Sequence, residues 1–388
     1  MKFILAPDKF KGSLTGIEFC NAVEEGIKSI MPEAEIVKMP LADGGDGIIE
    51  ILNYHLNGKR LTVTVNDPLF KPVEASYLYI ESSQTAFIEM AEASGIKLLP
   101  IEKQNCFLTS TFGTGEIIKQ AINKGVKTIV LGIGGSATND CGIGMACALG
   151  YQFLDKNGNE VIPIGKNLSS INKIDVSNVN EALKTVEFKV ACDVTNPLYG
   201  RNGAAYVYAS QKGASVDEIN LLNKGLEHFS NVLLEYFKVD VQKIEGSGAA
   251  GGMGAGALVF LNANLLSGID LVKEVINFDK KIEGADWIIT GEGNLDSQTF
   301  SGKTIKGVIS SAKNYNINVA ALCGSISLSK ESLNDLGIIY ADSIINLASN
   351  LDDAMVNSYK YLAVISSNFT ENINTSSIFK KEKSSNKN

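Results

Sequence analysis

Short apolar runs alternate with amphipathic stretches at both ends of the chain. Residues 15–30 and 303–313 repeat apolar positions at helical spacing, and the runs with the length of buried strands are residues 3–6, 36–41, 286–290, 319–323 and 338–345. Buried strands that alternate with helices are typical of a parallel sheet with helices on its faces. Both chain ends, residues 1–60 plus 283–366, are therefore predicted to form one doubly wound, Rossmann-like α/β domain.

The middle of the chain has a different pattern, with more short strands between turns. Strands are predicted at residues 61–65, 75–80 and 85–90, and Asn157-Gly158 predicts a hairpin that joins residues 151–154 to residues 160–162. We expect residues 61–282 to form a second α/β domain inserted into the first. Residues 367–388 are rich in Ser, Asn, Lys and Thr, so they are predicted to form a disordered polar tail.

Composition narrows the class of protein. The chain has 388 residues and a net charge of −8, so it lacks the basic surface typical of nucleic-acid binding. Only two histidines and six scattered cysteines are present, which makes a zinc site of the usual ligand types improbable. The first apolar run ends at Pro7, too soon for a secretory signal, and no run is long enough to cross a membrane. We expect a cytoplasmic protein, and the sequence leaves a homodimer open.

Glycine-rich loops with charged residues follow three strands of the terminal domain. Because parallel sheets bind ligands at the carboxyl ends of their strands, and helix amino termini favour phosphate, these loops predict a nucleotide site. Ser13 suits either a helix cap or a phosphate contact, and Asp43 and Glu292 are candidate metal ligands. The candidates are Asp8, Lys9, Lys11, Gly12 and Ser13, then Asp43, Gly44 and Gly45, and finally Gly291, Glu292 and Asp296.

The inserted domain contributes further glycines, carboxylates and cations. The sequence has no nucleophile beside a base, and this combination suits phosphoryl transfer, which needs positioning, cations and a metal. Asp193 follows a predicted strand, so it suits a general base that acts on the acceptor, while Lys11, Arg201 and Lys212 are candidate catalytic cations. Binding candidates here are Gly134, Gly135, Ser136, Asn139, Asn196 and Gln211.

One loop also fits a different class of enzyme. Residues 132–137 match G-x-G-x-x-A after a predicted strand, and Asp155 follows about twenty residues later, as in a dinucleotide-binding fingerprint. An NAD-dependent oxidoreductase of a small hydroxy acid is therefore one alternative. A non-catalytic sugar-acid sensor is another, because binding needs the same loops without turnover.

Taken together, eight segments resemble the bacterial type I glycerate kinase family, in the family's order. They are APDKFKGSL (6–14), PLADGGDG (40–47), IEMAEASG (88–95), TFGTGEII (111–118), GIGGSATND (132–140), ACDVTNPL (191–198), QKGA (211–214) and TGEGNLDSQT (290–299). This resemblance implies two α/β domains and the ATP-dependent, Mg²⁺-assisted phosphorylation of (R)-glycerate. It also implies ADP and 2-phosphoglycerate as products. Asn294 departs from the family's pattern, which often has Arg at that position.

Overall fold

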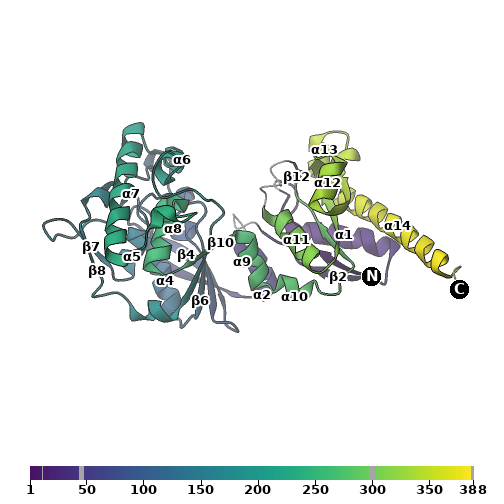
Figure 1. Ribbon diagram of the computed structural model, residues 1–388, viewed down its shortest axis with the longest axis horizontal. Coiled ribbons are helices and arrows are strands. Elements are labelled where there is room, and N and C mark those ends of the chain that lie inside the picture. Colours follow the sequence, from purple (N-terminus) through teal and green to yellow (C-terminus); the bar gives the residue numbers. More distant parts are fainter. Residues whose placement is uncertain (11, 43–47, 297–302, 386–388) are drawn as a thin grey trace. The chain divides into compact units, whose positions relative to one another are not determined.

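The computed structural model describes residues 1–10, 12–42, 48–296 and 303–385. The chain folds into two compact units (Figure 1). The first unit comprises Met1–Asp43 with Val272–Asn388, and the second comprises Gly44–Leu271.

A five-stranded parallel sheet forms the centre of the first unit, in the order β15-β13-β11-β1-β2. Phe3 on β1 lies opposite Trp287 on β11 and Ile36 on β2, so strands from both chain ends share one sheet. Phe3, Ile4 and Leu5 on β1 and Ile288 and Ile289 on β11 are fully buried, as expected for central strands of a parallel sheet. The strands are β1 (Lys2–Leu5), β2 (Glu35–Lys38), β11 (Trp287–Thr290), β13 (Asn318–Cys323) and β15 (Ile338–Ser343), with a separate pair of β12 (Asn294–Leu295) and β14 (Ser325–Ile326).

Helices cover this sheet, and the first of them begins with a capping box. Thr15 Oγ1 accepts a hydrogen bond from Glu18 N (3.1 Å), and Glu18 Oε2 accepts one from Thr15 N (2.8 Å). The helices are α1 (Gly16–Ile30), α10 (Phe278–Lys281), α11 (Lys303–Asn314), α12 (Lys330–Leu336), α13 (Leu351–Val356) and α14 (Ser358–Ser385), while α9 (Gly268–Val275) crosses the boundary between the units. The predicted α/β class is confirmed.

The expectation of a disordered tail from residue 367 is wrong for residues 367–375. These residues continue α14, which packs against α1. Phe369 is fully buried, with its ring centroid 6.5 Å from that of Phe3, 5.1 Å from Trp287 and 4.9 Å from Tyr340. The apolar stripe at positions 362, 365, 369 and 373 has helical spacing and is buried, although most residues between these positions are polar.

The second unit is built on a six-stranded mixed sheet, in the order β10-β9-β6-β5-β4-β3. β10, β9, β6 and β5 are parallel, whereas β4 pairs antiparallel with both β5 and β3. The strands are β3 (Lys59–Asn66), β4 (Pro72–Ile80), β5 (Thr85–Glu89), β6 (Thr128–Gly132), β9 (Glu187–Ala191) and β10 (Asn264–Leu266). The helices are α2 (Ile48–Leu56), α3 (Ala91–Ser94), α4 (Phe112–Asn123), α5 (Ile143–Ala148), α6 (Ala204–Tyr208), α7 (Val216–Phe237) and α8 (Ala249–Phe260).

The predicted hairpin is only partly correct. Its turn forms, with Gly158 N bonded to Asp155 O (3.0 Å) and Gly158 at φ +87°. However, β7 (Gln152–Leu154) pairs antiparallel with β8 (Lys173–Asp175), and residues 160–162 contribute only a single bridge to Leu154. The apolar partner for β7 therefore comes from a later part of the chain, which the local turn signal does not reveal.

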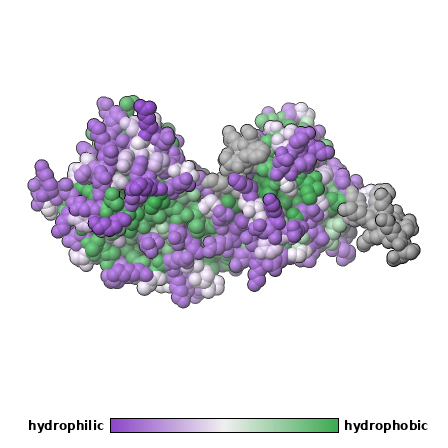
Figure 2. Space-filling model, in the orientation of Figure 1, coloured by the Kyte–Doolittle hydropathy of each residue, from purple (hydrophilic) through white to green (hydrophobic). Residues whose placement is uncertain are grey.

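The compact units divide at different residues from the predicted domains. Helix α2 contacts β4 and β5, so it belongs to the second unit, although the sequence pattern grouped it with the first domain. Hydrophilic residues cover most of the visible face of both units (Figure 2). Within the described residues, no helix is both long and apolar enough to span a membrane.

The burial of Phe369 generates a stability prediction. Phe369→Ala should lower the free energy of unfolding by about 3–5 kcal/mol, because it removes a buried ring from the core of the first unit. Urea unfolding followed by the fluorescence of Trp287, the only tryptophan, measures the change. Val364→Ala on the same helix is the control, because Val364 is 40% exposed. Equal stability of the two variants would mean that α14 does not contribute to the core.

Candidate functional site

In the first unit, the segments that follow β1 and β11 are tied together at the carboxyl edge of the sheet. Ala6 N donates to Ile289 O (2.8 Å), and Asp8 N donates to Gly291 O (2.9 Å). Thr290 Oγ1 donates to Ala6 O (2.8 Å), so a side chain joins the two segments as well. The predicted candidates Asp8, Gly291 and Glu292 are thus brought to one place.

Asp8 anchors its loop to the start of α11. Its Oδ1 accepts from Lys9 N (2.7 Å), and its Oδ2 accepts from the buried Thr304 Oγ1 (2.7 Å). These contacts hold the carboxylate of Asp8 at the carboxyl edge of the sheet, beside the start of α11. Thr304 was not among the predicted site residues.

The loop with Gly12 and Ser13 forms a tight turn before α1. Gly12 has φ +78°, and Ser13 N donates to Phe10 O (2.9 Å). The side chain that caps α1 belongs to Thr15, so the helix-cap interpretation of Ser13 is wrong. Ser13 is half-buried, and its hydroxyl lies 3.5 Å from Met355 O.

The loop after β11 is braced by the segment that follows β13. Gly324 N donates to Glu292 O (3.1 Å), which fixes the backbone of the loop. Asn294 Nδ2 donates to Asp296 Oδ2 (2.6 Å), and Asn294 Oδ1 accepts from Ser325 Oγ (2.6 Å). Where the family often has a cation, this chain thus has an amide that holds one of the candidate carboxylates in place.

Four candidates, Lys11, Asp43, Gly44 and Gly45, lie outside the described residues. Over residues 1–10, 12–42, 48–296 and 303–385, no three acidic, histidine or cysteine side chains gather as metal ligands. All six cysteines are free thiols.

In the second unit, the loop after β6 lies beside the segment that follows β5. Ile96 N donates to Gly135 O (2.9 Å), and Ala137 N donates to Ser94 O (2.9 Å). Gly134 and Gly135 are exposed, and Gly135 adopts φ +68°. The helix that a dinucleotide fingerprint requires directly after the glycines does not form there, since α5 begins only at Ile143.

Asp155, the acidic residue of that fingerprint, does not take the position that ribose binding requires. The half-buried Asp155 accepts hydrogen bonds through its carboxylate from the backbone N–H groups of Asn159 (2.9 Å) and Asn157 (2.8 Å). These bonds lower the pKa of Asp155 and hold its side chain within its own turn. Asp155 is a turn residue rather than a ribose ligand.

Lys212 is the buried cation of the second unit. Its Nζ donates to Ser136 Oγ (2.6 Å) and to Thr138 O (2.9 Å), and the residue is 5% exposed. No described carboxylate lies within ion-pair distance of its ammonium group. Burial lowers the pKa of Lys212 to about 8, because removal of the charged form from water is unfavourable. Lys212 and Ser136, predicted separately from distant motifs, are thus in direct contact.

Asp140 holds the same loop in place through buried hydrogen bonds, and it was not among the predicted site residues. Its carboxylate is fully buried and accepts from Thr111 N and Thr111 Oγ1 (both 2.8 Å), and from Gly142 N and Gly144 N (both 3.2 Å). Burial raises the pKa of Asp140, and these hydrogen bonds act in the opposite direction. The polar run at residues 138–140, which is unusual so close to an apolar strand, was the feature of the sequence that could have indicated a role for Asp140.

Three neighbouring polar side chains have buried atoms without a hydrogen-bond partner in the described part of the chain. They are Thr138 Oγ1, Asn139 Oδ1 and Nδ2, and Ser247 Oγ. The loop that carries Ser247 packs closely here, because a Cβ on Gly251 would overlap the backbone of Thr138. Asn139 was predicted to bind ligand, and Thr138 and Ser247 were not. Unpartnered buried polar atoms are uncommon and often mark functional positions.

Asp193 lies just beyond the carboxyl end of β9, as predicted. It is half-buried, and its Oδ1 accepts from Gly268 N (3.1 Å) at the end of the neighbouring β10. Asn196 has a more structural role, because its amide donates to Asn202 O (2.8 Å) and accepts from Tyr208 Oη (2.6 Å). Arg201 and Gln211 are exposed.

Comparison with known proteins decides the family. The sequence profile of the glycerate kinase family matches residues 3–374. The chain belongs to the glycerate kinase family. A glycerate kinase of Bacillus subtilis is 43% identical over 93% of this chain and 95% of its own length. Glycerate 2-kinase of Escherichia coli is 42% identical over 95% of this chain and 97% of its own length.

A solved structure agrees with this assignment. The crystal structure of a Salmonella typhimurium LT2 protein provisionally named glycerate kinase 2 matches with a TM-score of 0.87 and 38% identity. The match covers 97% of this chain and 99% of the other. Membership of the glycerate kinase family, together with the loop geometry after β6, removes the oxidoreductase alternative.

The burial of Lys212 predicts how stability depends on pH. Its pKa is near 8 in the folded chain and near 10.5 when exposed, so between these values the unfolded chain binds more protons. The parent should therefore become more stable, relative to Lys212→Met, as pH rises from about 8 to 10.5. The quantity to compare is the difference in free energy of unfolding between the parent and Lys212→Met, which should increase over this range. Denaturant unfolding at several pH values measures it, with the exposed Lys224→Met as control. A difference that is constant with pH would show that Lys212 is solvated.

Proposed function

We propose that this chain catalyses the ATP-dependent phosphorylation of (R)-glycerate, with Mg²⁺, to give 2-phosphoglycerate and ADP. The observation that carries the proposal is the match to the glycerate kinase family over nearly the whole chain. The glycine-rich loops with carboxylates at strand ends in both units support it, because phosphoryl transfer depends on positioning and charge rather than on covalent chemistry. A cytoplasmic location stays a prediction.

Asp193 is our candidate for the group that accepts the proton from the attacking hydroxyl. It stands at the carboxyl edge of the second unit's sheet, where its carboxylate is half-buried and oriented by Gly268 N. Neither of the two histidines lies in a loop described above, so a carboxylate is the available base.

Lys212 is our candidate for the cation that stabilises negative charge during transfer. Its ammonium has three donors, and the two bonds to Ser136 and Thr138 leave one for an anionic group. A preorganised, desolvated donor of this kind stabilises developing charge better than a flexible exposed one. Lys9, Lys11 and Arg201 are proposed to supply further positive charge.

Mg²⁺ would bind with the nucleotide rather than in a ready-made cage. The described residues offer separate carboxylates, Asp8 and Glu292, on adjoining loops and no three-ligand cluster. This donor set fits Mg²⁺, which is usually held by one or two carboxylates together with substrate phosphates and water. When bound, the ion would neutralise charge on the phosphates. Its proposed protein ligands are Glu292 and Asp43, of which Asp43 lies outside the described residues, and Asp8 offers a further carboxylate on the adjoining loop.

Release of ADP that requires glycerate tests the proposal directly. With ATP, Mg²⁺ and (R)-glycerate, ADP should accumulate in proportion to phosphorylated product, and no ADP should form without glycerate. Phosphorus NMR identifies the product, because phosphate on the secondary hydroxyl couples to a single proton and phosphate on the primary hydroxyl couples to two. Glycerate binding without ADP release would instead support the sensor alternative.

Replacement of the proposed base should abolish turnover but spare the nucleotide. Asp193→Asn should lower kcat by about 10²–10⁴-fold, because the carboxylate no longer accepts the hydroxyl proton. Calorimetric titration with ADP should give an unchanged Kd, and Mn²⁺ should not restore activity. Asp217→Asn, at the exposed start of α7, is the matched control. Turnover within about threefold of the parent would remove Asp193 from the chemistry.

Replacement of the proposed metal ligand should behave differently. Glu292→Gln should raise the Mg²⁺ concentration needed for half-maximal activity, and excess Mg²⁺ or Mn²⁺ should partly restore the rate. The direct readout is Mn²⁺ binding in the presence of ADP, followed by electron paramagnetic resonance. Glu283→Gln, an exposed residue before β11, is the control. Unchanged Mn²⁺ affinity in Glu292→Gln would contradict the assignment.

A further inference from the structure

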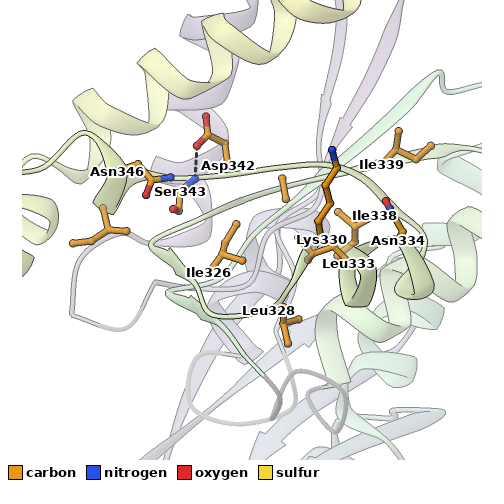
Figure 3. A pocket seen from close by; sticks show the side chains of 12 residues that line it. Ile326, Leu328, Lys330, Leu333, Asn334, Ile338, Ile339, Asp342, Ser343 and Asn346 are labelled. Atoms are coloured by element: carbon orange, nitrogen blue, oxygen red, sulfur yellow. Dashed lines mark hydrogen bonds between the residues drawn. The ribbon is translucent and has the colours of Figure 1, made fainter.

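A pocket of about 440 Å³ opens within the first unit, apart from the loops discussed so far (Figure 3). Side chains from β14, α12 and β15, and from the segments that connect them, form its walls. The apolar walls include Ile326, Leu328, Leu333, Ile338 and Ile345. Leu333 and Ile338 are buried, whereas Ile326, Leu328 and Ile345 are half-buried and present apolar surface to the pocket.

Polar and charged residues make up nearly half of the pocket lining, namely Lys330, Asn334, Asp342, Ser343 and Asn346. Asp342 Oδ1 accepts a hydrogen bond from Ser343 N (2.8 Å; Figure 3). The lining contains one cation, Lys330, and one carboxylate, Asp342, so the pocket has no excess of positive charge. This composition suits a neutral, flat ligand with hydrogen-bonding edges and does not suit a phosphate group.

The pocket adjoins the loop that carries Glu292. Ile326 lies opposite Leu295 in the β12–β14 pair, and Gly324 N donates to Glu292 O (3.1 Å). Ile345 N donates to Gly324 O (3.1 Å), which joins the end of β15 to the same segment. Adjacent strands lie about 4.8 Å apart. In the sheet, β15 is two strands from β11 and three strands from β1, so roughly 10–14 Å separate it from the proposed nucleotide loops. A base and its phosphates can bridge such a separation.

We propose that this pocket binds the purine base of the nucleotide whose phosphates bind at the loops that carry Asp8 and Glu292. The inference rests on the proposed kinase function and assigns the base to the pocket formed by β14, α12 and β15. Apolar side chains contact the faces of the ring, and Asn334 and Asp342 offer acceptors for an exocyclic amino group. The phosphates then bind at the carboxyl ends of β1 and β11, and the base binds beside β15, the outer strand of the same sheet.

Leu328→Asp and Leu328→Ala test the assignment, because Leu328 is half-buried and contributes apolar wall without filling the core. Leu347→Asp is the matched control, since Leu347 is 43% exposed in the same unit and is not part of the pocket lining. Loss of apolar contact and the added charge should raise KM for ATP about tenfold in Leu328→Asp and severalfold in Leu328→Ala. The kcat and the KM for glycerate should stay within about twofold of the parent.

Two fragments of the nucleotide, adenosine and tripolyphosphate, test the binding of the base and of the phosphates separately. Adenosine should compete with ATP in the parent, and its Kd by calorimetry should weaken about tenfold in Leu328→Asp, whereas the Kd of inorganic tripolyphosphate should not change. Unchanged adenosine affinity in both Leu328 variants would overturn the proposal. If the parent shows no kinase activity, the proposed function fails. Adenosine binding by the parent and the variants then still shows whether the pocket binds the base.

Discussion

The parallel pairing of β1 with β11 is the contact on which the site of the first unit depends. It joins residues that are about 285 positions apart, since Phe3 lies opposite Trp287. The hydrogen bonds from Ala6 N and Asp8 N continue this pairing beyond the strands, so the register of the sheet determines which residues meet at its edge. A slip of one residue would move Asp8 away from Gly291 and reverse the face of every side chain on β1.

Buried polar groups play the corresponding role in the second unit. Asp140 and Lys212 are both withdrawn from water, which is unfavourable unless their hydrogen-bonding capacity is used. Asp140 satisfies that condition with four donors from two segments, whereas Lys212 is bonded only to a hydroxyl and a carbonyl. The loop between β6 and α5 is therefore held in place by charged groups rather than by a regular helix. A bound anion would stabilise the buried charge of Lys212.

The sequence predicts the strands and the family well and the tertiary partners poorly, for physical reasons. β1, β11 and β13 are short apolar runs whose burial follows from composition, and the motif loops follow from where those runs end. The contact of Lys212 with Ser136 depends on how distant segments pack, which no local pattern encodes. For Phe369 the local pattern was sufficient but was outweighed. The apolar stripe of α14 was present in the sequence, but the polar residues around it dominated the average composition.

Burial also separates the candidate cations into two kinds. Lys212 is held in place within a poorly hydrated environment, where a charge at 4 Å interacts several times more strongly than it does in bulk water. Arg201 is exposed, so water and salt screen its charge until a ligand displaces them. In the proposed function, the two residues would therefore act at different steps: Lys212 would stabilise charge that develops during transfer, and Arg201 would help to capture an anionic substrate. In a chain with a net charge of −8, the placement of a few cations therefore matters more than their number.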